Sequence, residues 1–328
     1  MARREDKLRA AADAAAAPLV YPAAWLLGRL RRHGLERLPR SRRALLRMGV
    51  FPVRDHYYEP RFDFSRLRRP LTADRPLPGV DLDVPGQLAF LDALTYAGEL
   101  AGTPQAPTGR LEFTFGNGHF EAGDAEVWYQ LIRARKPRRI VEIGSGFSTL
   151  VAVQAVRRNA EEDPAYTCAH VCIEPYERPW LEAAGAQVVR CLVEDADPGL
   201  FAALGEDDVL FIDSSHVVRP QGDVLYEYLE LLPALAPGVI VHVHDVFTPR
   251  DYPEEWLADR VRLWNEQYLL EAFLTHNDSW RVLAALNHLQ HHHHEELKRA
   301  APFLTAASEP GSFYLQRRGS RRCTSTRA

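Results

Sequence analysis

Two glycines follow an apolar run in the segment Arg139–Leu150, which reads RIVEIGSGFSTL. The apolar residues predict a buried strand, and Gly144 with Gly146 predicts a tight turn that lets a ligand approach the backbone. A dinucleotide-binding turn needs a third glycine where this chain has Thr149, and no G-K-[ST] phosphate loop is present. The pattern therefore argues against a ligand with a diphosphate group. The alternative to any ligand at this turn is a strand, turn and helix with a structural role only.

A carboxylate ends the next apolar run, VCIEPY, at Glu174. At this position after the two-glycine turn, a carboxylate can accept hydrogen bonds from both hydroxyl groups of a ribose. An exposed surface glutamate is the alternative. Taken together with the turn, the spacing favours a ligand that contains a nucleoside.

Titratable side chains also end two later apolar runs. The run DVLFID ends at Asp213 and is followed by His216, and the run GVIVHVHDVF contains His244 and Asp245. Because central strands of an α/β sheet are normally apolar, we expect these groups to face a cleft. Histidine has a pKa suited to proton transfer near neutral pH, so the pattern favours acid–base chemistry.

The pattern E-x-G-x-G, with F-I-D-x-x-H and H-D-V-F further along, resembles the class I methyltransferases that depend on S-adenosylmethionine (SAM). Within that class it resembles the bacterial small-molecule O-methyltransferases, over about residues 115–250. The resemblance implies SAM as cofactor and a hydroxyl group of a small molecule as acceptor. The cofactor contacts that it implies are Glu142, Gly144, Ser145, Gly146, Ser148, Glu174, Tyr176, Glu194, Asp195 and Asp213.

Two mechanisms are open for the methyl transfer. In the first, His216 or His244 removes the acceptor proton while the transfer proceeds in line. Asp213 or Asp245 then orients the imidazole. In the second, Asp213, His244 and Asp245 bind a divalent metal that lowers the pKa of the acceptor hydroxyl. The catechol O-methyltransferases have an acid where this chain has His244, and a histidine ligand shifts the preference from Mg²⁺ towards Mn²⁺, Fe²⁺ or Zn²⁺. Histidines that only satisfy buried backbone groups are a third alternative.

Alternating strand-like and helical runs predict the fold that positions these groups. They indicate a doubly wound, mostly parallel, seven-stranded α/β sheet of the Rossmann-like kind, with a long helix after residue 258. The predicted strands are Arg139–Ile143, His170–Ile173, Gln187–Cys191, Asp208–Ile212, Val239–His244, Trp280–Leu286 and Ser312–Leu315.

The chain is predicted to have three parts: an N-terminal segment over 1–104 that covers the acceptor site, a SAM-binding domain over 105–317 and a disordered basic tail over 318–328. Residues 1–47 carry a net charge of +8 in a chain of net charge −4, and they predict helices broken by Pro18 and Pro22. The apolar stretch Ala14–Leu27 is short for a membrane-spanning helix, so we expect no transmembrane segment. Contact of residues 1–50 with a membrane surface remains open.

The partner expected for this chain is a small molecule rather than a nucleic acid, and a homo-oligomer is left open. Four cysteines without a C-x-x-C pair suit a cytoplasmic protein. Candidate walls of the acceptor pocket are His56–Pro60 and Arg250–Trp256, with core packing as the alternative. The loop Phe115–Phe120 is expected to contact the cofactor or the acceptor, with a hairpin-like turn at Asn117–Gly118 as the alternative. The run His291–His294 is expected to be a solvated helix face.

Three other functions remain as alternatives to an O-methyltransferase. They are an N-methyltransferase, a non-catalytic SAM-binding protein and a nucleic-acid methyltransferase that uses the basic arm.

Overall fold

The computed structural model describes residues 2–54, 56–176 and 178–319, and it divides the chain into two compact units, 1–68 and 69–328. The predicted first segment ran to residue 104. The structure instead assigns residues 69–104 to the second unit, because helix α3 (Val84–Asp92) packs against strand β6 (Trp280–Ala285) of the sheet. Most of the predicted tail, residues 320–328, lies outside the described residues.

The first unit holds two helices, α1 (Ala2–His33) and α2 (Pro39–Arg47). The prediction that prolines break the first helix is wrong, because α1 continues through both Pro18 and Pro22. One helical span, Lys7–His33, is by length and composition long and apolar enough to cross a membrane. The length argument drawn from Ala14–Leu27 alone therefore fails, and the expectation of no transmembrane segment stays a prediction.

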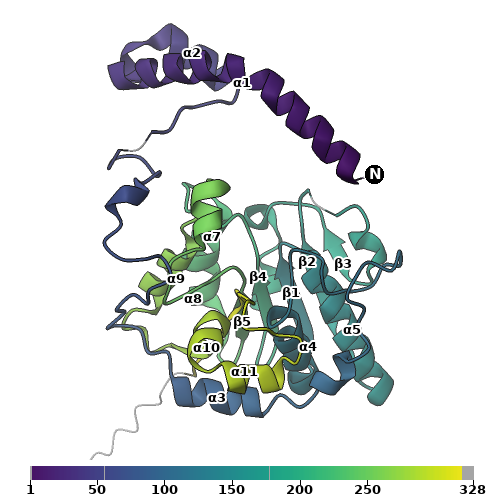
Figure 1. Ribbon diagram of the computed structural model, residues 1–328. Helices are drawn as coiled ribbons and strands as arrows, with labels where there is room; N and C mark the ends of the chain where they lie inside the picture. Colours follow the sequence, from purple (N-terminus) through teal and green to yellow (C-terminus); the bar gives the residue numbers. More distant parts are fainter. Residues whose placement is uncertain (1, 55, 177, 320–328) are drawn as a thin grey trace, which may run out of the picture. The chain divides into compact units, whose positions relative to one another are not determined.

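A seven-stranded sheet lies at the centre of the second unit (Figure 1), in the order β3-β2-β1-β4-β5-β7-β6. Strands β1 to β5 pair in parallel, and β7 is antiparallel to both of its neighbours. The predicted doubly wound, mostly parallel sheet is confirmed. Besides β6, the strands are β1 (Arg139–Ile143), β2 (Ala169–Ile173), β3 (Gln187–Val189), β4 (Val209–Ile212), β5 (Ile240–Val243) and β7 (Phe313–Arg317).

Helices cover both faces of this sheet, so alternate residues of its central strands enter two separate cores. On one face Phe211 packs with α3, α4, α5, α10 and α11, and on the other face Ile212 packs with α6 to α9. Burial on both faces explains why the central strands are mostly apolar, with Glu142 in β1 and His242 in β5 as buried exceptions. The remaining helices are α4 (Asp124–Arg135), α5 (Phe147–Glu162), α6 (Gly199–Ala202), α7 (Asp223–Tyr226), α8 (Leu232–Ala234), α9 (Glu266–Leu274), α10 (Leu286–His292) and α11 (His294–Ala300).

The long helix expected after residue 258 is interrupted. A short helical turn at Glu255–Asp259 is followed by non-helical chain up to the start of α9, and Val261 in this gap has a φ of 51°. A β-branched residue in this left-handed conformation cannot continue a right-handed helix. The interruption leaves Arg262 and Trp264 on a loop, where Trp264 packs on the ring of His216.

Candidate active site

A cavity of about 330 Å³ opens where strands β1, β2 and β4 end. Five of the predicted cofactor residues line it: Gly144, Glu174, Tyr176, Glu194 and Asp213. This is the edge of a parallel sheet at which open α/β folds bind ligands. The wall also includes residues that the sequence interpretation missed, namely Pro175, Leu192, Ser214, Ser215, Arg219 and Asp223.

Gly144 fixes the shape of this cavity. Its φ is 76°, and a Cβ atom at this position would lie 1.9 Å from the carbonyl oxygen of Asp213. Any other residue would therefore be strained and would displace the backbone of Asp213. The Gly144 amide donates to the carbonyl oxygen of Ile173 at 3.0 Å, so the turn is also fastened to β2.

Glu142 does not line the cavity. Its side chain is fully buried and accepts hydrogen bonds from the hydroxyl groups of Ser148, at 3.1 Å, and Thr149, at 2.9 Å. The other carboxylate oxygen lies 2.5 Å from Nε2 of His170. These contacts fasten the start of α5 to β1 and β2, so Glu142 supports the turn from behind.

The other predicted cofactor residues that lie outside the cavity wall are Ser145, Gly146, Ser148 and Asp195, of which Asp195 is exposed.

The two glutamates on the cavity wall differ in hydrogen bonding. Glu174 accepts from the backbone amides of Ser145, at 3.2 Å, and Tyr176, at 2.9 Å, which holds its carboxylate in place. Glu194 instead has a buried Oε2 atom without a hydrogen-bond partner among the described residues. Buried polar atoms are normally satisfied, so an unpaired acceptor on a cavity wall indicates a missing donor from a ligand.

Next to this cavity lies a cluster of carboxylates and imidazoles, Asp213, His216, His244 and Asp245. Nε2 of His216 lies 3.2 Å from Asp213 and 3.7 Å from Asp245, while its Nδ1 lies 2.8 Å from the buried carboxylate of Glu266. Nδ1 of His244 lies 3.6 Å from both Asp213 and Asp245. The sequence prediction that these four residues lie together is therefore correct in geometry.

A second cavity of about 520 Å³ meets the cluster from another side. His244 and Asp245 line it, together with Asp124, His119 and Trp256. The two cavities have no lining residue in common, but Asp213 on the wall of the first lies 3.6 Å from His244 on the wall of the second. A methyl group and an acceptor held in the two cavities would therefore meet at the cluster.

The structure places the segments predicted to line the acceptor pocket in different environments. Phe115, His119 and Trp256 line the second cavity, whereas Tyr252 is buried and packs against Phe247. The segment His56–Pro60 belongs to the first unit.

The acids of the cluster raise the pKa values of its two histidines. Burial lowers the pKa of His216, but hydrogen bonds to Asp213 and Glu266 outweigh burial, so the pKa lies well above 6.5. Burial likewise opposes the charge of His244, but Asp245 and Asp213 raise its pKa well above 6.5. Burial raises the pKa of Asp245. The resting site thus pairs cationic imidazoles with buried acids.

Two buried acids of this site escaped the sequence interpretation. Asp124 starts α4, accepts from the amides of Gly311 and Ser312, and lies 3.6 Å from Nε2 of His244. Glu266 starts α9, where it resembles an ordinary surface acid in sequence, yet it is 1% exposed. Both positions are common at the first turn of any helix, so the sequence carries no signal that separates them from exposed capping residues.

Backbone strain accompanies the cluster. His216 and Asp245 have φ values of 59° and 58°, in the left-handed region that L-residues rarely adopt. Such conformations persist where the surrounding structure enforces them, and they gather at active sites.

The structure brings together a metal-ligand set that differs from the predicted one. Asp213, His216 and Asp245 offer ligand atoms that all lie within 4.8 Å of one another, whereas the prediction had His244 in place of His216. The predicted set of Asp213, His244 and Asp245 remains a prediction.

Comparison with known proteins relates part of the second unit to one class of domain. Residues 141–246 match a family model described as a methyltransferase domain. This stretch holds the two-glycine turn, the carboxylates of the first cavity and the cluster, and it is thus similar to methyltransferase domains.

An uncharacterized protein from Archaeoglobus fulgidus is 30% identical to this chain over 171 residues, which cover 48% of the chain and 75% of that protein. The chain belongs to the family of this archaeal protein. A solved O-methyltransferase from Bacillus cereus in complex with SAH is 14% identical, with a TM-score of 0.37 over 71% of this chain and 91% of that protein.

Replacing Gly144 by alanine should weaken SAM binding at least about tenfold, or ~1.4 kcal/mol of binding free energy. The added Cβ atom would push Asp213 away from the cavity wall. Calorimetric titration with SAM measures the change. Glu174→Gln, which removes the charge without removing volume, should also weaken binding.

Gly185→Ala is the matched control for Gly144→Ala. Gly185 also has a positive φ, 104°, but the nearest atom to an added Cβ is a methyl group of Val153 at 3.5 Å. This variant should keep its SAM affinity. If folded Gly144→Ala and Glu174→Gln both bind SAM as the unaltered chain does, the first cavity is not the cofactor site.

Proposed function

We propose that this chain transfers the methyl group of SAM to a hydroxyl oxygen of a small-molecule acceptor. The observation that carries the proposal is the meeting of two cavities at one cluster of acids and imidazoles. SAM occupies the first cavity, with its ribose hydroxyls on Glu174 and its adenine near Glu194. The acceptor occupies the second cavity, with its hydroxyl group at His244.

Asp213 has a place in both halves of this reaction. Burial raises its pKa, but His244 and His216 lower it more, so the carboxylate is ionised. An anion on the wall of the first cavity stabilises the positively charged sulfonium of SAM. The same carboxylate lies 3.6 Å from Nδ1 of His244, where it stabilises the imidazolium that forms when this ring takes up the proton.

His244 is the proton acceptor in this proposal. Its buried Nδ1 atom has no hydrogen-bond partner among the described residues, and its ring lines the acceptor cavity. The acceptor oxygen attacks the methyl carbon, the bond from that carbon to sulfur breaks, and the hydroxyl proton goes to His244. S-adenosylhomocysteine and the methyl ether are the products.

His216 is a positioning residue rather than a proton acceptor. Its ring lies under Trp264 with Nδ1 on Glu266, and it lines neither of the two cavities. A cationic imidazole here holds Asp213 and Asp245 in place and offsets their charge.

A divalent metal is the alternative route, and the donor set of Asp213, His216 and Asp245 fits one. Glu266 on the far nitrogen of His216 would hold the imidazole for such an ion. When bound, a metal would lower the pKa of the acceptor hydroxyl.

The test incubates the protein with SAM and a panel of phenols, aliphatic alcohols and amines, and identifies the products by mass spectrometry. We expect methyl ethers, and we expect the rate to persist with EDTA. His244→Asn should lower kcat by about 100-fold or more, because a general base contributes at least that factor. His216→Asn should have the smaller effect, with SAM affinity retained in both variants.

Exclusive methylation of amines, with no loss of rate in His244→Asn, would contradict transfer to oxygen. Loss of all activity in EDTA, with recovery on adding Mn²⁺ or Zn²⁺, would favour the metal route.

The rate should rise with pH, with a midpoint above the ordinary histidine value of about 6.5. The reason is that His244 must lose its proton before it can accept another, and its neighbours raise its pKa. A profile of kcat/KM against pH measures the midpoint. This rising limb should be absent in His244→Asn, and a midpoint below 6.5 would exclude His244 as the base.

A further inference from the structure

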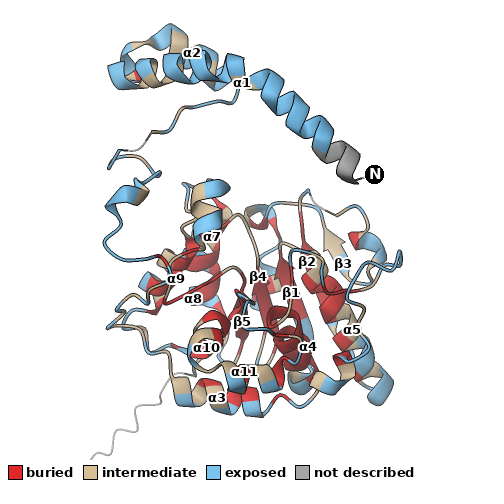
Figure 2. Ribbon diagram, in the orientation of Figure 1, coloured by how far each residue is buried: buried red, intermediate tan, exposed pale blue. Residues whose placement is uncertain are grey.

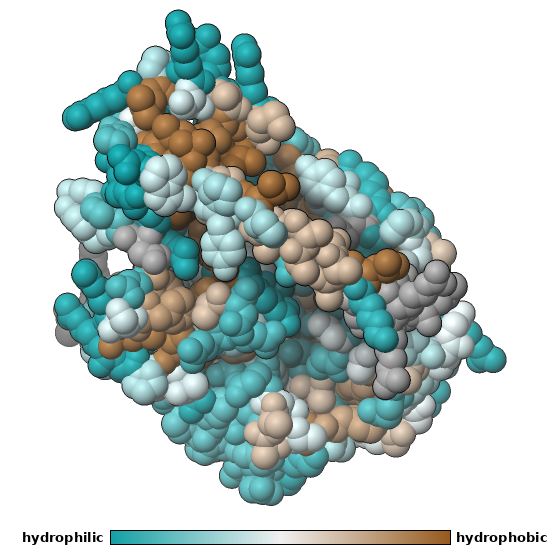
Figure 3. All heavy atoms as spheres, turned by 45° about the horizontal axis from the view of Figure 1, so that its top comes forward, coloured by the Kyte–Doolittle hydropathy of each residue, from teal (hydrophilic) through white to brown (hydrophobic). Residues whose placement is uncertain are grey.

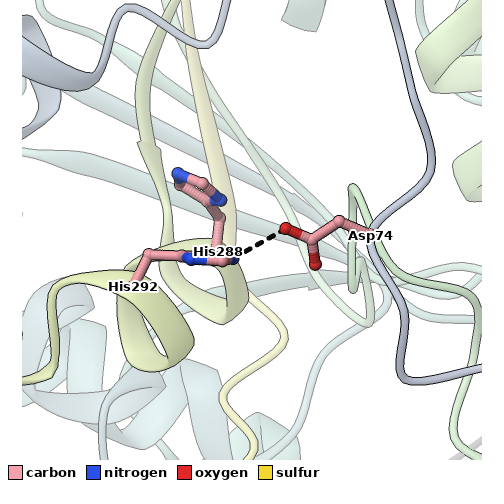
Figure 4. A group of neighbouring side chains, drawn as sticks. All are labelled: Asp74, His288 and His292. Atoms are coloured by element: carbon pink, nitrogen blue, oxygen red, sulfur yellow. Dashed lines mark hydrogen bonds and ion pairs between the residues drawn. The ribbon is translucent and has the colours of Figure 1, made fainter.

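Far along the chain from the active-site cluster, three side chains from two segments converge. Asp74 lies on the loop that precedes α3, and His288 with His292 lies on α10, four residues apart and therefore on one helix face. Each offers a ligand atom within 4.8 Å of the other two. Figure 4 shows the carboxylate of Asp74 directed at the imidazoles, with Nε2 of His292 at 2.7 Å from Oδ2.

His288 provides the second observation. Both of its ring nitrogens are buried, and neither has a hydrogen-bond partner among the described residues. The ring contacts the imidazoles of His292 and His293, but its nitrogens have no donor or acceptor. Buried polar atoms are normally satisfied, so two unpaired nitrogens indicate a missing ligand.

We propose that Asp74, His288 and His292 bind a Zn²⁺ ion. Two imidazole nitrogens and one carboxylate oxygen suit zinc, whereas Mg²⁺ and Ca²⁺ prefer oxygen ligands throughout. Nε of Arg250 donates to Oδ1 of Asp74 at 3.2 Å and holds the carboxylate, so that Oδ2 faces Nε2 of His292. The ion would take the place of the hydrogen bond between Oδ2 and that nitrogen.

The ion would fasten the start of the second unit to the sheet domain. Asp74 follows shortly after the boundary at Arg68, and the next residue, Arg75, pairs with Asp251 and with Glu271 of α9. Its backbone amide donates to the carbonyl oxygen of Pro249. Pro249 follows closely after Phe247, which lines the second cavity. A zinc ion at Asp74 would therefore restrict the motion of the segment that carries Phe247.

The test uses the full chain, purified without a histidine tag and treated with chelator. Zn²⁺ is titrated by calorimetry, and Co²⁺ serves as an absorbance probe of the ligand geometry. Two other groups, Glu142–His170–Cys172 and Asp213–His216–Asp245, could also bind metal, so the variants are compared by the number of ions bound. His288→Ala, His292→Ala and Asp74→Asn should each lose one equivalent, or bind it at least about tenfold more weakly.

His291→Ala and His294→Ala are the matched controls from the same histidine run. His291 contacts Glu309 and His294 contacts Gln290, so both variants should keep the equivalent. Zn²⁺ should raise the melting temperature of the controls but not of His288→Ala. Equal stoichiometry in His288→Ala, or equal loss in His291→Ala, would overturn the site. SAM affinity is measured alongside, and its retention in all variants keeps this result separate from the proposed reaction.

A different observation concerns the first unit. Large apolar side chains of α1 are exposed, among them Leu19, Tyr21, Trp25 and Leu26, and none of the apolar window within Lys7–His33 is buried. Figure 2 shows α1 and α2 mostly in the exposed colour, and Figure 3 shows hydrophobic side chains beside hydrophilic ones on the surface. Arginines follow directly, at 29, 31 and 32 and again at 40, 42, 43 and 47.

We infer that α1 binds the surface of a bilayer that contains anionic lipids. Exposed apolar and aromatic side chains enter the interface, and the arginines that follow pair with anionic headgroups. Charge complementarity favours an anionic membrane surface as the partner of this segment, since residues 1–47 carry a net charge of +8 on an otherwise acidic chain.

Flotation of the full chain with phosphatidylcholine vesicles, with and without phosphatidylserine, tests the inference. Binding should require phosphatidylserine and should fall several-fold in Leu19→Ser/Trp25→Ser. The control Tyr57→Ser/Tyr58→Ser removes exposed aromatics outside α1 and should float unchanged. Equal flotation with neutral vesicles, or of both double variants, would contradict binding through α1.

Discussion

The contact between the backbones of Gly144 and Asp213 determines how the two halves of the site are joined, because it excludes any side chain at residue 144. Strands β1 and β4 are parallel neighbours with Ile143 opposite Ile212, so the residues that follow them also lie opposite each other. The amide of Asp213 donates to the carbonyl oxygen of Ile143 at 2.8 Å, which leaves no room for a side chain on the glycine. One contact thus joins the turn of the first cavity to the carboxylate of the cluster.

The charges around that carboxylate offset one another in part. Four acids, Asp213, Asp245, Asp124 and Glu266, surround two imidazoles, and both imidazoles are buried together with Asp124 and Glu266. Isolated buried charges are costly, whereas alternating charges offset each other. The same arrangement that makes the cluster tolerable in a protein interior also ties its proton affinities together, so a change in one member alters the others.

The sequence predicted the sheet and the grouping of the cluster because both follow from local rules. Apolar runs that alternate with helices specify a parallel sheet, and residues at the carboxyl ends of its strands must gather at one edge. The same rules do not reach Asp124 and Glu266, because a residue at the first turn of a helix is buried or exposed according to what packs against it. They also failed for α1, where prolines were expected to end a helix that continues through them.

The histidine run shows the same limit from the other direction. In sequence, the run His291–His294 was expected to be a solvated helix face. His292 is exposed, while the other three histidines of the run are half-buried. The partner that gives His288 and His292 a different environment, Asp74, is more than 200 residues away in the chain. Pairings over such distances depend on the complete fold and leave no periodic trace in the sequence.

The left-handed backbone of His216 and Asp245 has a consequence for how this protein could change. Each such conformation costs a non-glycine residue roughly 1–2 kcal/mol, which the rest of the fold must offset. Glycine at either position would relieve that cost and remove a buried titratable group. Selection for thermal stability alone would therefore favour glycine at these two positions. Retention of His216 and Asp245 among homologues would indicate selection for the reaction, at a cost in folding stability.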